Sequence, residues 1–100
     1  MPERVHPRRL IAARVQAIYE NQAGQRVTTS AMFEDISAGG GCIRLGTPLP
    51  VGSQIGIQWL AKLFQVRVVH CRPDGMDYVL GFEKAEDQEP WPTERRRQSR

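Results

Sequence analysis

The chain has 100 residues, which is enough for one domain with a modest core. Hydrophobic residues make up 40% and charged residues 25%, an ordinary globular composition, and no apolar stretch approaches the ~20 residues that span a bilayer. The N-terminus has no apolar run of the signal-peptide kind. Length and composition therefore argue against a membrane-spanning protein, a secreted protein and an elaborate enzyme, and we expect a cytoplasmic chain.

The net charge is +3, and the positive excess lies at the beginning of the chain. Residues 1–14 carry Arg4, Arg8, Arg9 and Arg14 against Glu3. Twelve of the fourteen basic residues are arginines, whose planar guanidinium contacts phosphates and base edges with two parallel hydrogen bonds. This arm suits a nucleotide-like anion, and a solvated basic surface is the alternative interpretation.

Most of the remaining chain alternates polar and apolar residues with a period of two, which predicts β-strands. Turn residues separate the strands, notably at Asn21–Gln25, around Pro48 and Pro50, and at Pro73-Asp74-Gly75. The predicted strands are Ala13–Tyr19, Arg26–Ile36, Cys42–Leu45, Gln54–Leu60, Leu63–Cys71 and Met76–Phe82. Six short strands at nearly regular spacing predict a small six-stranded antiparallel barrel, which removes exposed strand edges.

The alternation also assigns side chains to faces. It places His70 on the interior face with Phe64, Val66 and Val68, and Trp59 in the core or at its rim. It places Met76 on the apolar face of the last strand, with Tyr78, Leu80 and Phe82. Cys42 and Cys71 form no metal-ligand spacing, so we expect two buried thiols and no metal site.

The predicted organisation has three parts. Residues 1–12 form an N-terminal ligand-binding arm, residues 13–83 form the barrel core, and residues 84–100 form a polar tail. A short helix is possible only from Thr93 onward, and the rest of the tail is expected to be solvated or disordered. Trp91, between Pro90 and Pro92, is expected to anchor the tail on the barrel.

Two motifs carry the chemistry. Arg4-Val5-His6-Pro7-Arg8 precedes the first strand, and Asp35-Ile36-Ser37-Ala38-Gly39-Gly40 ends the second. Their order and spacing resemble the PilZ domain family, receptors for the bacterial second messenger cyclic di-GMP, whose pattern is Arg-x-x-x-Arg followed by Asp/Asn-x-Ser-x-x-Gly. The resemblance covers about residues 3–85, and Tyr78–Phe82 is similar to the family's last strand.

The resemblance implies a site for cyclic di-GMP. It assigns Arg4 and Arg8 to guanine and phosphate groups, and Asp35, Ser37 and Gly40 to the other side of a ligand base. The chemistry agrees, because guanine offers acceptors to a guanidinium on one edge and donors to a carboxylate on another. Gly39 and Gly40 permit left-handed backbone and close approach to a ligand. Further candidates for ligand contact are Arg9, Gly39 and Arg44.

The predicted protein is therefore a receptor that orders its arginine arm on cyclic di-GMP and signals to a protein partner. It has no catalytic residue and no cofactor, and neither a membrane nor a nucleic acid polymer is expected as a partner. Glu3 stands where many relatives have a further arginine, which leaves affinity and stoichiometry open.

Other interpretations remain. Asp35 and Ser37 before glycines also suit an ordinary turn. A PilZ-like protein-interaction module that does not bind the nucleotide is the main alternative function. A small oligonucleotide-binding barrel is disfavoured, because Phe33, Phe64, Tyr78 and Phe82 occupy apolar faces instead of alternating with basic residues on an exposed strand face.

Overall fold

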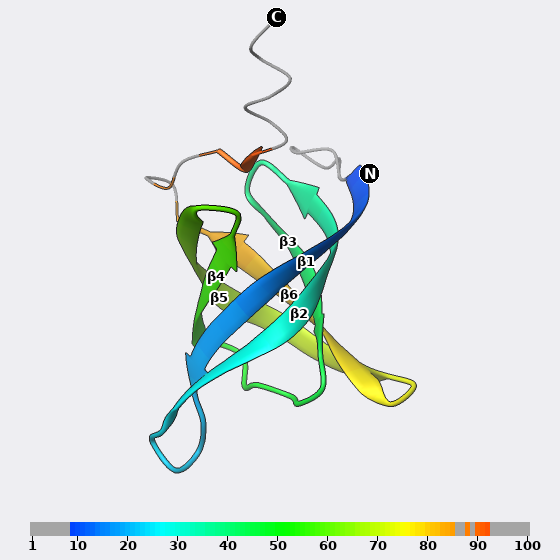
Figure 1. Ribbon diagram of the computed structural model, residues 1–100. Coiled ribbons are helices and arrows are strands. Elements are labelled where there is room, and N and C mark those ends of the chain that lie inside the picture. Colours follow the sequence, from blue (N-terminus) through cyan, green and yellow to red (C-terminus); the bar gives the residue numbers. More distant parts are fainter. Residues whose placement is uncertain (1–8, 86–87, 89, 93–100) are drawn as a thin grey trace, which may run out of the picture.

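The computed structural model describes residues 9–85, 88 and 90–92, apart from the side chain of Arg9. These residues form six β-strands, which confirms the all-β prediction (Figure 1). The strands are β1 (Arg9–Glu20), β2 (Arg26–Ser37), β3 (Gly40–Leu45), β4 (Gln54–Trp59), β5 (Lys62–Asp74) and β6 (Asp77–Lys84). β1 begins four residues before the predicted strand, because Arg9 and Leu10 already pair with β2.

The strands close into one antiparallel barrel in the order β1-β2-β3-β6-β5-β4 (Figure 1). β1 and β4 seal the barrel through three residue pairs, from Gln16 opposite Gln58 to Ile18 opposite Gly56. Closure gives both outer strands of the sheet a hydrogen-bonded neighbour along these three pairs, which shortens the edge available for pairing with another chain. The predicted barrel is confirmed.

The core fills the barrel interior because alternate side chains of each strand point inward. In β5, Phe64, Val66 and Val68 are buried, while the residues between them are exposed. Phe33 is fully buried at the centre of an aromatic cluster, with ring centroids 5.0 Å from Trp59 and 5.2 Å from Trp91. Trp59 therefore belongs to the core, which was one of its two predicted locations, the other being the rim.

Cys42 and Cys71 lie at separate positions and form no disulfide. Cys42 is buried, as predicted, whereas Cys71 is only half-buried and packs against the core. Cys42 pairs with Gly81 across β3 and β6, while Cys71 pairs with Leu80 across β5 and β6.

A β-bulge in β5 makes the prediction for His70 wrong. The pairing of β5 with β6 shifts between Val68 and His70, so an extra residue interrupts the period of two. His70 is consequently exposed on the outer surface instead of lying in the core. Its imidazole covers Gly81, because a Cβ built at Gly81 would overlap that ring.

The predicted turns exist, with one difference at the last hairpin. Asn21 caps the first loop, since its Oδ1 accepts hydrogen bonds from the backbone N–H groups of Ala23 and Gln25, both at 2.9 Å. In the last hairpin Asp74 pairs with Asp77, which leaves Gly75 (φ +67°) and Met76 as a two-residue turn. The prediction that Met76 shares the apolar face of β6 is wrong, because this turn leaves its side chain 93% exposed.

The barrel has two distinct ends. One end gathers the start of β1, the β2–β3 turn, the β4–β5 turn and the end of β6, and the segment with Trp91 crosses it (Figure 1). The other end carries the β1–β2 loop and the β3–β4 connection (Figure 1). We call the first the motif end, because the residues Asp35–Gly40 lie there.

Candidate functional site

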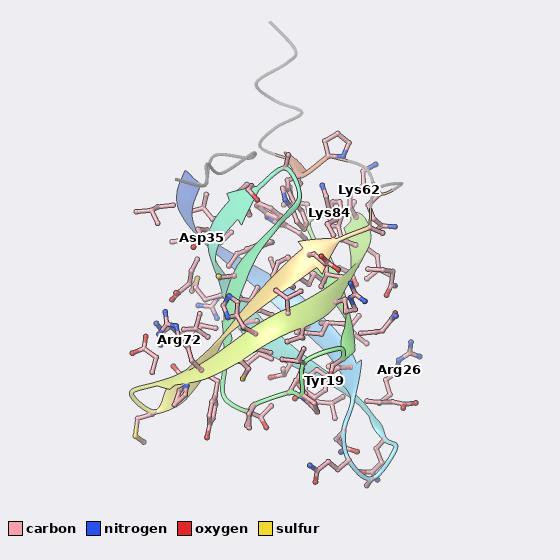
Figure 2. The ribbon with its side chains drawn as sticks, turned by 180° about the vertical axis from the view of Figure 1, so that it is seen from behind. Tyr19, Arg26, Asp35, Lys62, Arg72 and Lys84 are labelled. Carbon is pink, nitrogen blue, oxygen red and sulfur yellow. The ribbon has the colours of Figure 1, made fainter. Side chains whose placement is uncertain are left out.

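The Asp35-x-Ser37 motif forms the last three residues of β2, directly before the connection to β3. Ser37 pairs with Gly40, and Ala38 and Gly39 form the connection between the strands. Ile36 between the two motif residues is fully buried, so Asp35 and Ser37 project to the outer surface of the barrel. Both are half-buried, and Asp35 is seen on the outside of β2 in Figure 2. The structure thus presents an acidic and a hydroxyl side chain on one face.

A bulge sets the spacing of the acidic side chains in β2. The pairing of β2 with β3 shifts between Phe33 and Asp35, so Glu34 is the extra residue and Asp35 stands opposite Cys42. The carboxylate of Glu34 accepts a hydrogen bond from Nε of Arg44 at 2.7 Å. Glu34, rather than Asp35, is therefore the β2 carboxylate that pairs with Arg44 of β3.

Arg44, one of the further candidates for ligand contact, connects β3 with three other strands. In addition to Glu34, its Nη2 donates to Oδ2 of Asp74 at 2.8 Å, and its Nη1 lies 3.8 Å from Oδ2 of Asp77. The hydrogen bonds to Glu34 and then Asp74 raise the pKa of Arg44, and the hydrogen bond from Arg44 lowers the pKa of Asp74. The guanidinium thus joins β3 to β2 and to the β5–β6 hairpin.

The beginning of β1 lies directly beside the motif. Arg9 pairs with Ile36 and Leu10 pairs with Asp35, so the backbone that continues the N-terminal arm runs next to the Asp35-x-Ser37 segment. Arg4 and Arg8, the two arginines of the first motif, lie outside the described residues, as does the side chain of Arg9. The structure therefore brings together the end of the arm and the second motif.

Gly40 of the motif allows β3 to pack closely against β6. Gly39 and Gly40 do not adopt the left-handed backbone that their sequence permits, since the described glycines with positive φ are Gly24, Gly52 and Gly75. A Cβ at Gly40 would instead overlap the backbone carbonyl oxygen of Phe82 on β6. The carbonyl of Gly39 accepts a hydrogen bond from the N–H of Lys84 at 2.8 Å.

The sequence indicated an anchoring role for Trp91 but missed its partner. The indole Nε1–H donates to the backbone carbonyl of Ser37 at 2.7 Å, and the side chain is fully buried. These two residues are 54 positions apart, so no local pattern reports the contact. The only sequence signal is a tryptophan flanked by Pro90 and Pro92 in an otherwise polar tail.

One groove lies at the opposite end of the barrel. It has a volume of about 630 Å³ and runs between the β1–β2 loop and the β3–β4 connection, with Tyr19, Asn21 and Leu49 in its wall. No lysine or arginine lines this groove, and Glu20 does, so its charge is wrong for a phosphate-bearing ligand.

No three His, Cys, Asp or Glu side chains of the described residues are grouped so that they could hold a metal ion. In the same part of the chain, no helix has the length and apolar character needed to cross a membrane.

The chain is a small antiparallel β-barrel with the Asp35-x-Ser37 motif at one end. The family model described as PilZ domain matches residues 2–90, and the chain belongs to this family. No curated protein matches the sequence.

Two solved structures share the fold. One is the K. pneumonia MrkH–c-di-GMP complex, with a TM-score of 0.66 and 13% identity over 88% of this chain and 47% of that one. The other is YcgR from Escherichia coli in complex with c-di-GMP, with a TM-score of 0.55 and 19% identity over 94% of this chain and 42% of that one. The chain thus spans less than half the length of either protein.

Proposed function

We propose that the protein is a receptor for cyclic di-GMP, bound at the motif end by the N-terminal arginines and the Asp35-x-Ser37 segment. The observation that carries this proposal is the register of β1 on β2, in which Arg9 lies opposite Ile36. That register places the residue that follows the first family motif opposite the middle of the second. Membership of the PilZ family and the fold shared with two c-di-GMP complexes support the choice of ligand.

The covalent chain limits how far the two arginines can be from the motif. Arg8 is bonded directly to Arg9, and Cα of Arg4 is at most about 17 Å from Cα of Arg9, even when the chain is fully extended. Cyclic di-GMP carries two phosphates and two guanines, and a guanidinium can bind a phosphate or the N7 and O6 acceptors of guanine with paired hydrogen bonds. Both arginines are therefore within reach of a ligand held beside Asp35.

Asp35 and Ser37 supply the complementary chemistry. A carboxylate accepts hydrogen bonds from the N1–H and N2–H₂ donors of guanine, and a hydroxyl donates to or accepts from base or phosphate groups. In our proposal Asp35 and Ser37 face the ligand from β2, with Gly40 opposite Ser37 on β3. Arg9 and Gly39 are secondary candidates, whereas Arg44 is engaged by Glu34 and Asp74.

The proposed mechanism is a change of order without catalysis. Binding brings residues 1–8 onto the barrel beside β1, and this part of the arm then creates a surface for a protein partner. The ligand is released unchanged, so the protein acts as a sensor and not as an enzyme. We expect this to occur in the cytoplasm, without a membrane or a nucleic acid polymer as partner.

The test is calorimetric titration of the full chain with cyclic di-GMP, with GTP as the control ligand. Arg8→Ala and Asp35→Ala should each abolish binding of cyclic di-GMP. The matched controls are Arg26→Ala and Glu20→Ala, because both side chains are exposed at the opposite end of the barrel. The controls should bind as the natural chain does.

Retained binding in both Arg8→Ala and Asp35→Ala would refute the site. A natural chain that neither binds cyclic di-GMP nor gains thermal stability from it would refute the receptor function, because a ligand that binds only the folded state must raise the unfolding midpoint. That result would favour the protein-interaction module instead.

A further inference from the structure

Trp91 fills the motif end of the barrel from a position outside the six strands. Its side chain is fully buried and is the largest among the fully buried side chains. Its ring centroid lies 4.6 Å from that of Phe64 and 5.2 Å from that of Phe33, and the Nζ of Lys84 lies 4.3 Å from it. Trp91 is therefore held on one side by the aromatic core and on the other by a cation–π contact.

The polar edge of this indole reaches the ligand motif. Its Nε1–H donates to the carbonyl of Ser37, and two residues further on the carbonyl of Gly39 accepts the N–H of Lys84. Two carbonyls of the β2–β3 turn are thus bound by residues that follow Glu83 in the chain. Because Ile36 anchors the start of the turn in the core, the peptide group after Ser37 is restrained from both ends.

We propose that Trp91 is a positioning residue for the cyclic di-GMP site: by holding the Ser37 carbonyl, it fixes the turn that presents Asp35 and Ser37 to the ligand. This inference rests on the proposed function. Trp91 itself is buried and acts through Ser37. Linkage makes the effect reciprocal, so the ligand stabilises the indole hydrogen bond by the same factor by which that bond improves ligand binding.

Trp59 provides a matched control within the same cluster. It is buried, on β4, with its ring centroid 5.0 Å from Phe33 and 6.1 Å from Trp91. Its indole makes no hydrogen bond with the β2–β3 turn among the described residues. Replacing either tryptophan by phenylalanine removes an indole from the core, but only one of the changes releases Ser37.

The experiment compares Trp91→Phe with Trp59→Phe by titration with cyclic di-GMP, at a temperature where both variants are folded. One net hydrogen bond corresponds to a change of about 3- to 10-fold in a dissociation constant. We expect Trp91→Phe to raise the Kd by about 3- to 10-fold and Trp59→Phe to change it less than about 2-fold. Equal effects of the two substitutions, or no effect of Trp91→Phe, would overturn the proposal.

Amide hydrogen exchange without ligand separates this inference from the proposed function. Trp91→Phe should accelerate exchange of the Lys84 N–H, which is bonded to Gly39 in the restrained turn, more than Trp59→Phe does. Unchanged Lys84 exchange would overturn the positioning role even if cyclic di-GMP binds. Faster exchange in a chain that does not bind cyclic di-GMP would support the restraint on the turn while the receptor function fails.

Discussion

Replacing Gly40 by alanine tests why the Asp35–Gly40 motif ends in glycine. A Cβ at this position would overlap the carbonyl oxygen of Phe82, and Cα of Glu83 would lie only 3.1 Å from it. Both neighbours are backbone atoms of a paired strand, so they cannot move aside as a flexible side chain can. β3 and β6 must therefore separate locally, at the pair that Gly40 forms with Glu83.

The cost follows from two contributions. Overpacking of a close-packed region costs about 1–3 kcal/mol. Separation of the strands also strains the hydrogen bond between Lys84 N–H and the Gly39 carbonyl, whose loss costs about 1 kcal/mol. We expect Gly40→Ala to lower the free energy of unfolding by about 2–4 kcal/mol.

The assay is urea unfolding followed by tryptophan fluorescence, with Gly46→Ala as the control. Gly46 has open space where a Cβ would be built and no positive φ, so alanine there should be neutral or stabilise by about 0.4–1 kcal/mol. A Gly40→Ala protein within about 0.5 kcal/mol of the natural chain would refute the reasoning. If the prediction holds, loss of ligand binding in Gly40→Ala reports the geometry of the barrel and not a lost ligand contact.

Two further predictions concern the β4–β5 turn and the Arg44 cluster. Leu60 is 75% exposed and has φ +59°, a backbone conformation that costs energy for any residue with a Cβ. In urea unfolding, Leu60→Gly should therefore be about 0.5–1 kcal/mol more stable than Leu60→Ala. The reverse order of stability would contradict the backbone strain assigned to this position. Arg44 lowers the pKa of Asp74 from its ordinary 3.8, so this carboxylate stabilises the fold above that pH and loses its contribution as the pH falls through the lower, folded-state value. Asp74→Asn should therefore lower the thermal midpoint at pH 7 and progressively less below pH 4, and an equal loss at pH 7 and pH 2 would show that the ion pair is not its source.

The barrel was largely predictable because strand alternation and turn residues are visible in short stretches of sequence. Alternation in segments such as Phe64–Val68 records a buried and an exposed face, and Gly75 marks a turn through its tolerance of positive φ. The second motif was predictable as a continuous stretch, and its resemblance to the PilZ family supplied the function. The register of Arg9 on Ile36, which places the start of β1 beside the second motif, required the structure.

What the sequence missed depends on irregular pairing and long-range contacts. The bulge before His70 inserts one residue and reverses the faces that follow, and no residue pattern in β5 signals it. Position 40 requires glycine because a Cβ there would overlap the backbone carbonyl oxygen of Phe82 on β6. The hydrogen bond from Trp91 to Ser37 likewise joins two segments that no spacing rule connects.

The central claim is that cyclic di-GMP binds at the motif end, and amide chemical-shift mapping tests it most directly. Titration of the labelled full chain with cyclic di-GMP should move the resonances of Leu10, Asp35, Ser37 and Gly40 most, and leave Asn21–Gln25 at the opposite end nearly unchanged. The same amount of GTP should produce no such pattern. Shifts centred on the Asn21–Gln25 loop, or none anywhere in the spectrum, would contradict the account.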